Sequence, residues 1–135
     1  MTSRRGSRPH SVRLRSRPYS ALVNPHDSNT SNTRESIAIP SKGKRIRVLR
    51  VTAIQEIADG RRLYEVYFGL GADISSKPDK AVDILDIPDL GQDSTRTYLK
   101  DEGPRGDRDE VLSGRWRGSP PSTGHKIMVE YVEES

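Results

Sequence analysis

Apolar and polar residues alternate in a strand-like pattern over most of this chain. The first run, Ser36–Pro40, is short and ends at a proline. A longer run covers residues 44–57, where Ile46 and Val48 alternate regularly before the alternation slips by one residue to Leu49. Because a strand keeps every second residue on one face, such a slip predicts a β-bulge or burial of both faces.

The dipeptide Asp59-Gly60 stands between two strand-like runs. Asp-Gly is typical of the tight turn of a β-hairpin. The run that follows it, residues 63–70, places Tyr64 and Val66 on one face. The sequence therefore predicts that this run returns beside the 44–57 run as its hairpin partner.

Four further runs complete the pattern. Residues 81–87 fit a strand or a two-turn helix, and we favour the strand; later strand-like runs cover 95–99, 110–116 and 125–133. About six or seven short strands with turn signals between them and no convincing long helix are typical of a small antiparallel β-sandwich or jelly roll. A partly open barrel is the alternative. We assign this all-β domain to residues 36–135.

Residues 1–35 have a different composition and predict an extended arm that is disordered unless it is bound to a partner. Serine, arginine, asparagine, threonine and proline dominate, and no apolar period is sustained. Up to Thr33 the segment holds six arginines and one acid, whereas the rest of the chain holds 17 basic and 18 acidic residues. The net charge of +4 therefore divides into +5 on the arm and −1 on the body.

The arginines of the arm are the first candidate functional residues. They are Arg4, Arg5, Arg8, Arg13, Arg15 and Arg17. Guanidinium groups contact phosphates in bidentate fashion, so salt-sensitive contact with nucleic acid is one interpretation of the arm. Contact with an acidic neighbouring subunit is the interpretation that the composition favours, and a targeting leader or no specific role is the third. Tyr19, Leu22 and Val23 form a short apolar island, which predicts an anchor for the arm.

The tripeptide Arg115-Trp116-Arg117 combines an aromatic ring with two cations. On the surface it would be a contact patch able to stack a nucleobase. The alternative, which we favour, is that the aromatic residues of this chain fill the core and rim of a small sandwich.

The other motifs are weaker candidates for a functional site. Arg105-Gly106-Asp107 matches an adhesion tripeptide, but chance within a charged loop explains it better. Acidic clusters at residues 83–93 and 107–110 lack the spacing of a calcium loop and predict ion pairs with nearby arginines. No cysteine, no apolar run of membrane-span length and no set of nucleophile, base and orienting group is present. We therefore expect no enzyme activity, metal, cofactor, small-molecule substrate or membrane contact.

Three short motifs occur in an order that resembles small virion-associated proteins of tailed bacteriophages. They are Ile39-Pro40, Gly43–Val48 and the closing strand Val129–Glu133. The arm lies outside the resemblance, and the middle of this chain is more charged than theirs. The resemblance implies a β-sandwich subunit without enzyme activity, in the capsid, the head–tail region or the tail of a virion.

Such a subunit would assemble in the host cytoplasm with other virion subunits, as a homo-oligomer in a symmetric array. Its arm would reach a neighbouring subunit or packaged DNA. The alternative from the residues themselves is a small nucleic-acid-binding β-barrel with a basic tail, which would bind through exposed aromatic side chains as well as through the arm.

Overall fold

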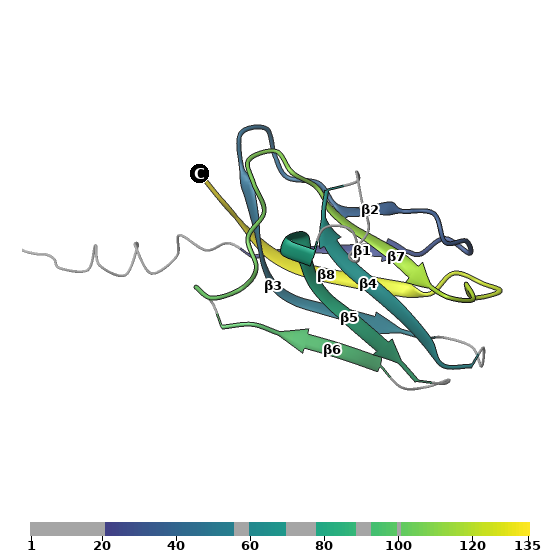
Figure 1. Cartoon of the computed structure of the whole chain (residues 1–135). Helices are drawn as coiled ribbons and strands as arrows, with labels where there is room; N and C mark the ends of the chain where they lie inside the picture. The colour runs from purple at the N-terminus through teal and green to yellow at the C-terminus, as the bar shows by residue number, and fades with distance from the viewer. Residues whose placement is uncertain (1–20, 56–59, 70–77, 89–92, 100) are drawn as a thin grey trace, which may run out of the picture.

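The computed structural model describes residues 21–55, 60–69, 78–88, 93–99 and 101–135 (Figure 1). Its strands are β1 (Leu22–Asp27), β2 (Glu35–Ala38), β3 (Arg45–Ile54), β4 (Arg62–Phe68), β5 (Ala81–Ile87), β6 (Asp93–Thr97), β7 (Leu112–Arg117) and β8 (Lys126–Glu134). A short 3-10 turn, η2 (Pro78–Lys80), precedes β5, and no α-helix occurs among the described residues. The predicted all-β fold is confirmed, and so is the favoured strand over residues 81–87.

The eight strands form two antiparallel sheets of four strands each. Sheet A has the order β1-β8-β3-β6 and sheet B has the order β2-β7-β4-β5. Figure 1 labels the strands of both sheets. The predicted antiparallel arrangement is confirmed.

One hydrophobic cluster contains residues from both sheets. Sheet A contributes Ile46, Val48, Val51, Ala53, Ile127 and Val129, and sheet B contributes Ile37, Tyr64, Val66, Leu85, Ile87, Leu112 and Trp116. The Tyr64 and Trp116 rings meet edge to face, with their centroids 4.7 Å apart. Gly114 makes room for this pair, because a Cβ at that position would lie 2.2 Å from the Tyr64 Oη.

The predicted bulge lies in the middle of β3. Val48 pairs with Tyr131 and Arg50 pairs with Glu130, so Leu49 is an extra residue on the β3 side. Val48 and Val51 consequently both lie in the core although they are three residues apart. The slip in the apolar alternation is therefore confirmed as a bulge.

The predicted hairpin around Asp59-Gly60 is wrong. β3 pairs with β6 and β8 in sheet A, whereas β4 pairs with β5 and β7 in sheet B. Residues 56–59 lie outside the described residues, but the chain on either side of them passes from one sheet to the other. The fully buried Gln55 donates a hydrogen bond of 2.8 Å to the Gly60 carbonyl at this crossing. A turn sequence such as Asp-Gly predicts that the chain changes direction, but it does not determine which strand pairs with the one that follows.

The body begins earlier in the chain than the predicted boundary at residue 35. β1 pairs with β8 along its whole length, from Leu22↔Tyr131 to Asp27↔Lys126. After Leu22 and Val23 it has no further large apolar side chain, and it contains Pro25, which an edge strand tolerates because one side of its backbone needs no partner. Residues 1–20, with the six arginines of the arm and Tyr19, lie outside the described residues, so the arm remains a prediction there.

Candidate functional site

The outer face of sheet A is a candidate contact surface. A row of uncharged side chains crosses all four strands, because the register places Pro25 opposite Met128, Met128 opposite Thr52, and Thr52 opposite Thr95. The Thr95 hydroxyl donates to Thr52 Oγ1 over 3.3 Å. We call these four residues the central row.

Ion pairs flank the central row on both sides. Arg50 Nη2 lies 2.7 Å from Glu130 Oε1 on one side, and Lys126 Nζ pairs with Asp27 on the other. The hydrogen bond from Lys126 lowers the pKa of Asp27 below its ordinary value. The charges of this face therefore cancel in pairs and leave a neutral strip between them.

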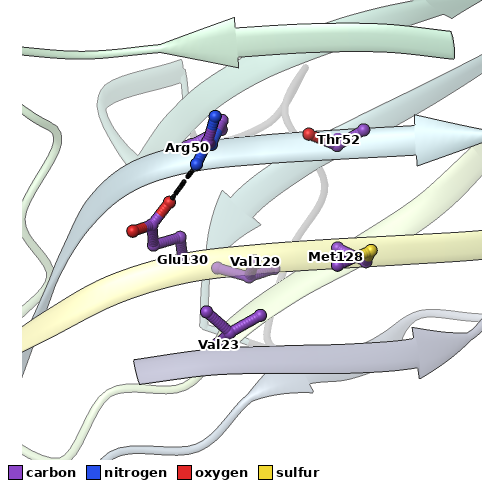
Figure 2. Close-up of a pocket in the computed structure, with 6 residues that line it drawn as sticks. All are labelled: Val23, Arg50, Thr52, Met128, Val129 and Glu130. Carbon is purple, nitrogen blue, oxygen red and sulfur yellow. Dashed lines mark hydrogen bonds and ion pairs between the residues drawn. The ribbon is translucent and has the colours of Figure 1, made fainter. Parts of the chain in front are cut away.

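A shallow pocket of about 230 Å³ opens on the same face, as Figure 2 shows. It is lined by Val23, Arg50, Thr52, Met128, Val129 and Glu130. Val23 is 57% exposed and its neighbour Leu22 is 41% exposed, so the two described members of the predicted apolar anchor lie uncovered on the edge strand β1. They belong to the sheet rather than to a free arm.

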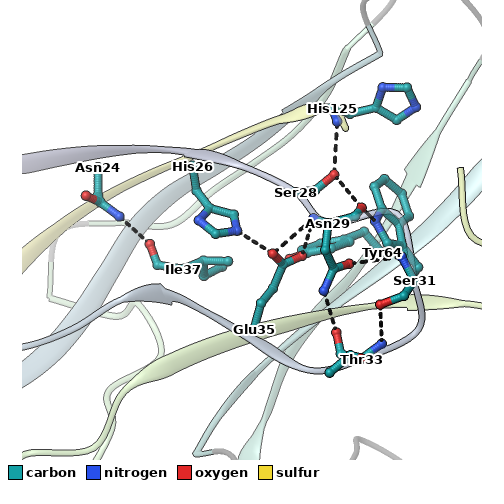
Figure 3. A network of polar contacts seen from close by, with 11 residues as sticks. Asn24, His26, Ser28, Asn29, Ser31, Thr33, Glu35, Ile37, Tyr64 and His125 are labelled. Atoms are coloured by element: carbon teal, nitrogen blue, oxygen red, sulfur yellow. Dashed lines mark hydrogen bonds and ion pairs between the residues drawn. The ribbon is translucent and has the colours of Figure 1, made fainter. Parts of the chain in front are cut away.

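A polar network fastens β1 and β2 to the core (Figure 3). Glu35 Oε1 lies 2.6 Å from His26 Nε2 and accepts a hydrogen bond from the Asn29 backbone over 3.1 Å. The Tyr64 hydroxyl donates to Glu35 Oε2 over 3.0 Å. Burial, together with the charge of Glu35, raises the pKa of Tyr64 well above its ordinary value, so this hydroxyl stays protonated and remains a donor.

The candidate contact patch at Arg115-Trp116-Arg117 is wrong for its central residue. Trp116 is 1% exposed, and its Nε1 donates to the Asn29 carbonyl over 3.0 Å. Its ring also meets His125 edge to face at 5.7 Å. The physical reason is the alternation along β7, which turns Trp116 into the core and its two neighbours outward. The interpretation that the aromatic residues fill the core is confirmed for this residue.

Arg115 and Arg117 flank a carboxylate that the sequence analysis did not single out. Glu65 lies on the outer face of β4 and is fully buried. Its carboxylate is 3.1 Å from Arg115 Nε and 3.7 Å from Arg117 Nη1. The cross-strand register pairs Glu65 directly with Arg115. The available signal was an acidic residue inside an otherwise apolar strand.

The predicted ion pairs with arginines are confirmed for Asp83, which lies 3.0 Å from Arg96, and for Asp86, which lies 2.7 Å from Arg61. Asp107 pairs instead with a lysine, Lys80, at 2.8 Å, and Asp89 lies outside the described residues. Within the adhesion-like tripeptide, Arg105 pairs with Glu134 at 3.3 Å. No metal-binding group of three or more His, Cys, Asp or Glu residues occurs in the described part of the chain. The described residues also hold no helix long and apolar enough to cross a membrane.

Glu134 makes the stability of the body pH-dependent. A hydrogen bond of 2.7 Å from Arg47, with Arg105 beside it, lowers the pKa of Glu134 below its ordinary value of 4.5. A depressed folded-state pKa stabilises the fold above the ordinary pKa, and this contribution is lost as the pH falls through the lowered value. We expect Glu134→Gln to lower the free energy of unfolding by about 1 kcal/mol at neutral pH.

Urea unfolding of both proteins over a pH series checks this prediction. The difference between wild type and Glu134→Gln should stay constant above pH 4.5 and shrink toward zero in more acidic buffer. Glu102→Gln, at an exposed carboxylate, is the control and should change stability little at any pH. A difference that persists unchanged in acid contradicts the prediction.

The described residues thus present a neutral sheet face, a buried polar network and paired surface charges. The arm arginines, which the sequence analysis placed first among the functional residues, lie outside the described residues. Comparison of the sequence with models of known protein families gives no match, and comparison with curated proteins gives none either.

Proposed function

We propose that this chain is a non-enzymatic structural subunit of a virion of the bacteriophage type. In this proposal the body packs against copies of itself, and the basic arm reaches a neighbouring subunit or packaged DNA. The observation that carries the proposal is the order in which the strands pair, taken together with the division of charge between arm and body.

The strands pair from the outside inward. β1 pairs with β8, β2 with β7, β3 with β6, and β4 with β5. A long antiparallel ribbon of this kind, wrapped so that its pairs alternate between two sheets, is the strand order of an eight-stranded jelly roll. Jelly rolls are frequent in viral capsid domains and occur also in lectins and cupins. We therefore propose a jelly roll as the finer description of the fold.

The fold does not choose among these functions, because function depends on sites rather than on folds. The division of charge between arm and body favours a virion subunit over a lectin or a cupin. Because Asp27 belongs to β1, residues 1–21 carry +6 and the body carries −2, so bodies can pack without strong mutual repulsion while the arms attract phosphate. The neutral outer face of sheet A supplies a surface for packing, because its charges are already paired.

The alternative of a nucleic-acid-binding β-barrel receives less support. It requires aromatic side chains on the surface for base stacking. Tyr64 and Trp116 are instead fully or almost fully buried, and Phe68 is 5% exposed. The proposal therefore assigns nucleic-acid contact to the arm rather than to an aromatic face of the body.

Sedimentation of the purified full-length chain tests the proposal. We expect large, regular particles in the wild type and a small, folded species in Met128→Lys, because this change puts an unpaired ammonium into the central row. Ile39→Lys makes the same type of change at a residue that is 67% exposed but outside sheet A, and it should leave the particles intact.

Circular dichroism of each variant separates lost assembly from lost folding. A wild-type chain that remains a monomer at every concentration, with and without nucleic acid, contradicts the proposed function. Particles of Met128→Lys that match those of the wild type move the contact away from the outer face of sheet A.

A further inference from the structure

The edge strand β1 contributes no side chain to the core that the two sheets share. Every residue from Leu22 to Asp27 is exposed or half-buried, and the hydrophobic cluster described for the two sheets contains none of them. In contrast β2, which follows β1 in the chain, buries Ile37 and Ala38. Among the described residues, the core is therefore complete without β1.

Polar contacts hold β1 on two sides. Its backbone forms an antiparallel ladder with β8 along its whole length. Toward β2, the Asn24 amide donates to the Ile37 carbonyl, and His26 lies 2.6 Å from Glu35 (Figure 3). These contacts are the same whether the β8 and β2 that make them belong to the same chain or to a second copy of it.

The loop between β1 and β2 can act as a hinge. Residues 30–34 are mostly exposed. The Asn29 amide donates to the Thr33 carbonyl over 3.0 Å and the Asn32 amide to the Gly118 carbonyl over 2.7 Å, both at the surface, where water replaces such hydrogen bonds at little cost. Five residues span about 17 Å when they are extended, so opening this loop can carry β1 to an adjacent copy.

We propose that copies of this chain exchange β1, so that the β1 of one copy pairs with the β8 of a second copy. The inference deepens the proposed function and rests on it for the partner, a second copy of the chain. Exchange needs no new surface, because each strand takes the place that the neighbour's own β1 has left. Since the arm leads directly into β1, exchange also brings the arm to the neighbouring subunit, which is the contact that its composition favours.

The register supplies a pair of positions for a disulfide test. Pro25 is opposite Met128 and has no N–H, so the two residues do not form a pair that exchanges two hydrogen bonds. Asp27 and Lys126, two residues further along each strand, form a pair of the same type. The Cα atoms of such a pair lie about 4.5 Å apart, which a disulfide can span. The chain has no cysteine of its own to interfere.

Oxidation of the full-length double variant Asp27→Cys with Lys126→Cys tests the exchange. The protein is purified reduced, oxidised with diamide at the concentration of the sedimentation experiment, and run on a denaturing gel without reductant. Exchange places the disulfide between two chains, so most chains should run as linked dimers or longer species. A disulfide within one chain leaves monomers, and monomers as the main oxidised species overturn the inference. Circular dichroism of the reduced protein verifies that it is folded.

Asp27→Cys with Leu99→Cys is the matched control. Leu99 is 69% exposed and follows β6, which is the opposite edge strand of sheet A. This variant carries the same number of thiols without the register, so linked species should form at least about tenfold more slowly than in the test variant. Equal rates show random collision and overturn the inference.

Sedimentation of the same samples distinguishes the exchange from the proposed function. Particles whose disulfides lie within single chains overturn the exchange and leave the proposed function in place. Linked dimers that never form particles support the exchange and contradict the proposed function. A test variant that forms no disulfide contradicts the β1–β8 register and overturns the exchange as well.

Discussion

Trp116→Ala is expected to lower the free energy of unfolding by about 3–5 kcal/mol, which is the range for removing a large aromatic residue from a core. Trp116 is 1% exposed and packs between Tyr64 and His125. The change also removes the 3.0 Å hydrogen bond to the Asn29 carbonyl, which among the described residues then keeps only the 3.2 Å hydrogen bond from the Ser28 hydroxyl. Since small domains are stable by only about 5–15 kcal/mol, this loss is a large share of the total stability.

Urea denaturation followed by circular dichroism measures this loss. Trp116→Phe keeps an aromatic ring but loses the indole donor, so its loss should be smaller. Leu99→Ala is the large-to-small control at a residue that is 69% exposed, and it should change stability by less than about 0.5 kcal/mol. A Trp116→Ala protein as stable as the wild type would contradict the core position of Trp116 and favour the surface contact patch considered in the sequence analysis.

The strand pattern could be predicted because it depends on neighbouring residues. The alternation along β3 showed both the strand and the bulge at Leu49, since an inserted residue shifts every later side chain to the other face. The partner of each strand could not be predicted in the same way. Asp59-Gly60 signalled a turn, but β4 is buried on both faces and becomes a central strand of the other sheet.

The sequence analysis did not predict β1 as a strand, for a related reason. Its Leu-Val-Asn-Pro-His-Asp sequence has little apolar period, and it owes its place to hydrogen bonds with β8, about a hundred residues away in the chain. The central row on sheet A likewise arises only when β1, β8, β3 and β6 come together. The burial of Trp116 was easier to predict, because the side chain of a strand residue points to the opposite face from its two neighbours, here two arginines.

Arg115→Met should destabilise the body by about 3 kcal/mol, because it removes the nearer cation from a carboxylate that is fully buried. Glu65 cannot reach bulk water, and Arg117 at 3.7 Å compensates only part of its charge. Arg117→Met removes the more distant and more exposed cation, so its cost should be clearly smaller, about 1 kcal/mol.

The double variant Glu65→Leu with Arg115→Met separates the effect of charge from the effect of packing. Replacing both members of a buried pair by apolar residues is often neutral, so the double variant should recover most of the loss seen in Arg115→Met. Urea denaturation of the three variants and the wild type completes the cycle. If the double variant is as unstable as Arg115→Met, the loss comes from the packing of the arginine stem rather than from an unpaired Glu65. Recovery of stability in the double variant would therefore show that Arg115 stabilises β4 by compensating the buried charge of Glu65.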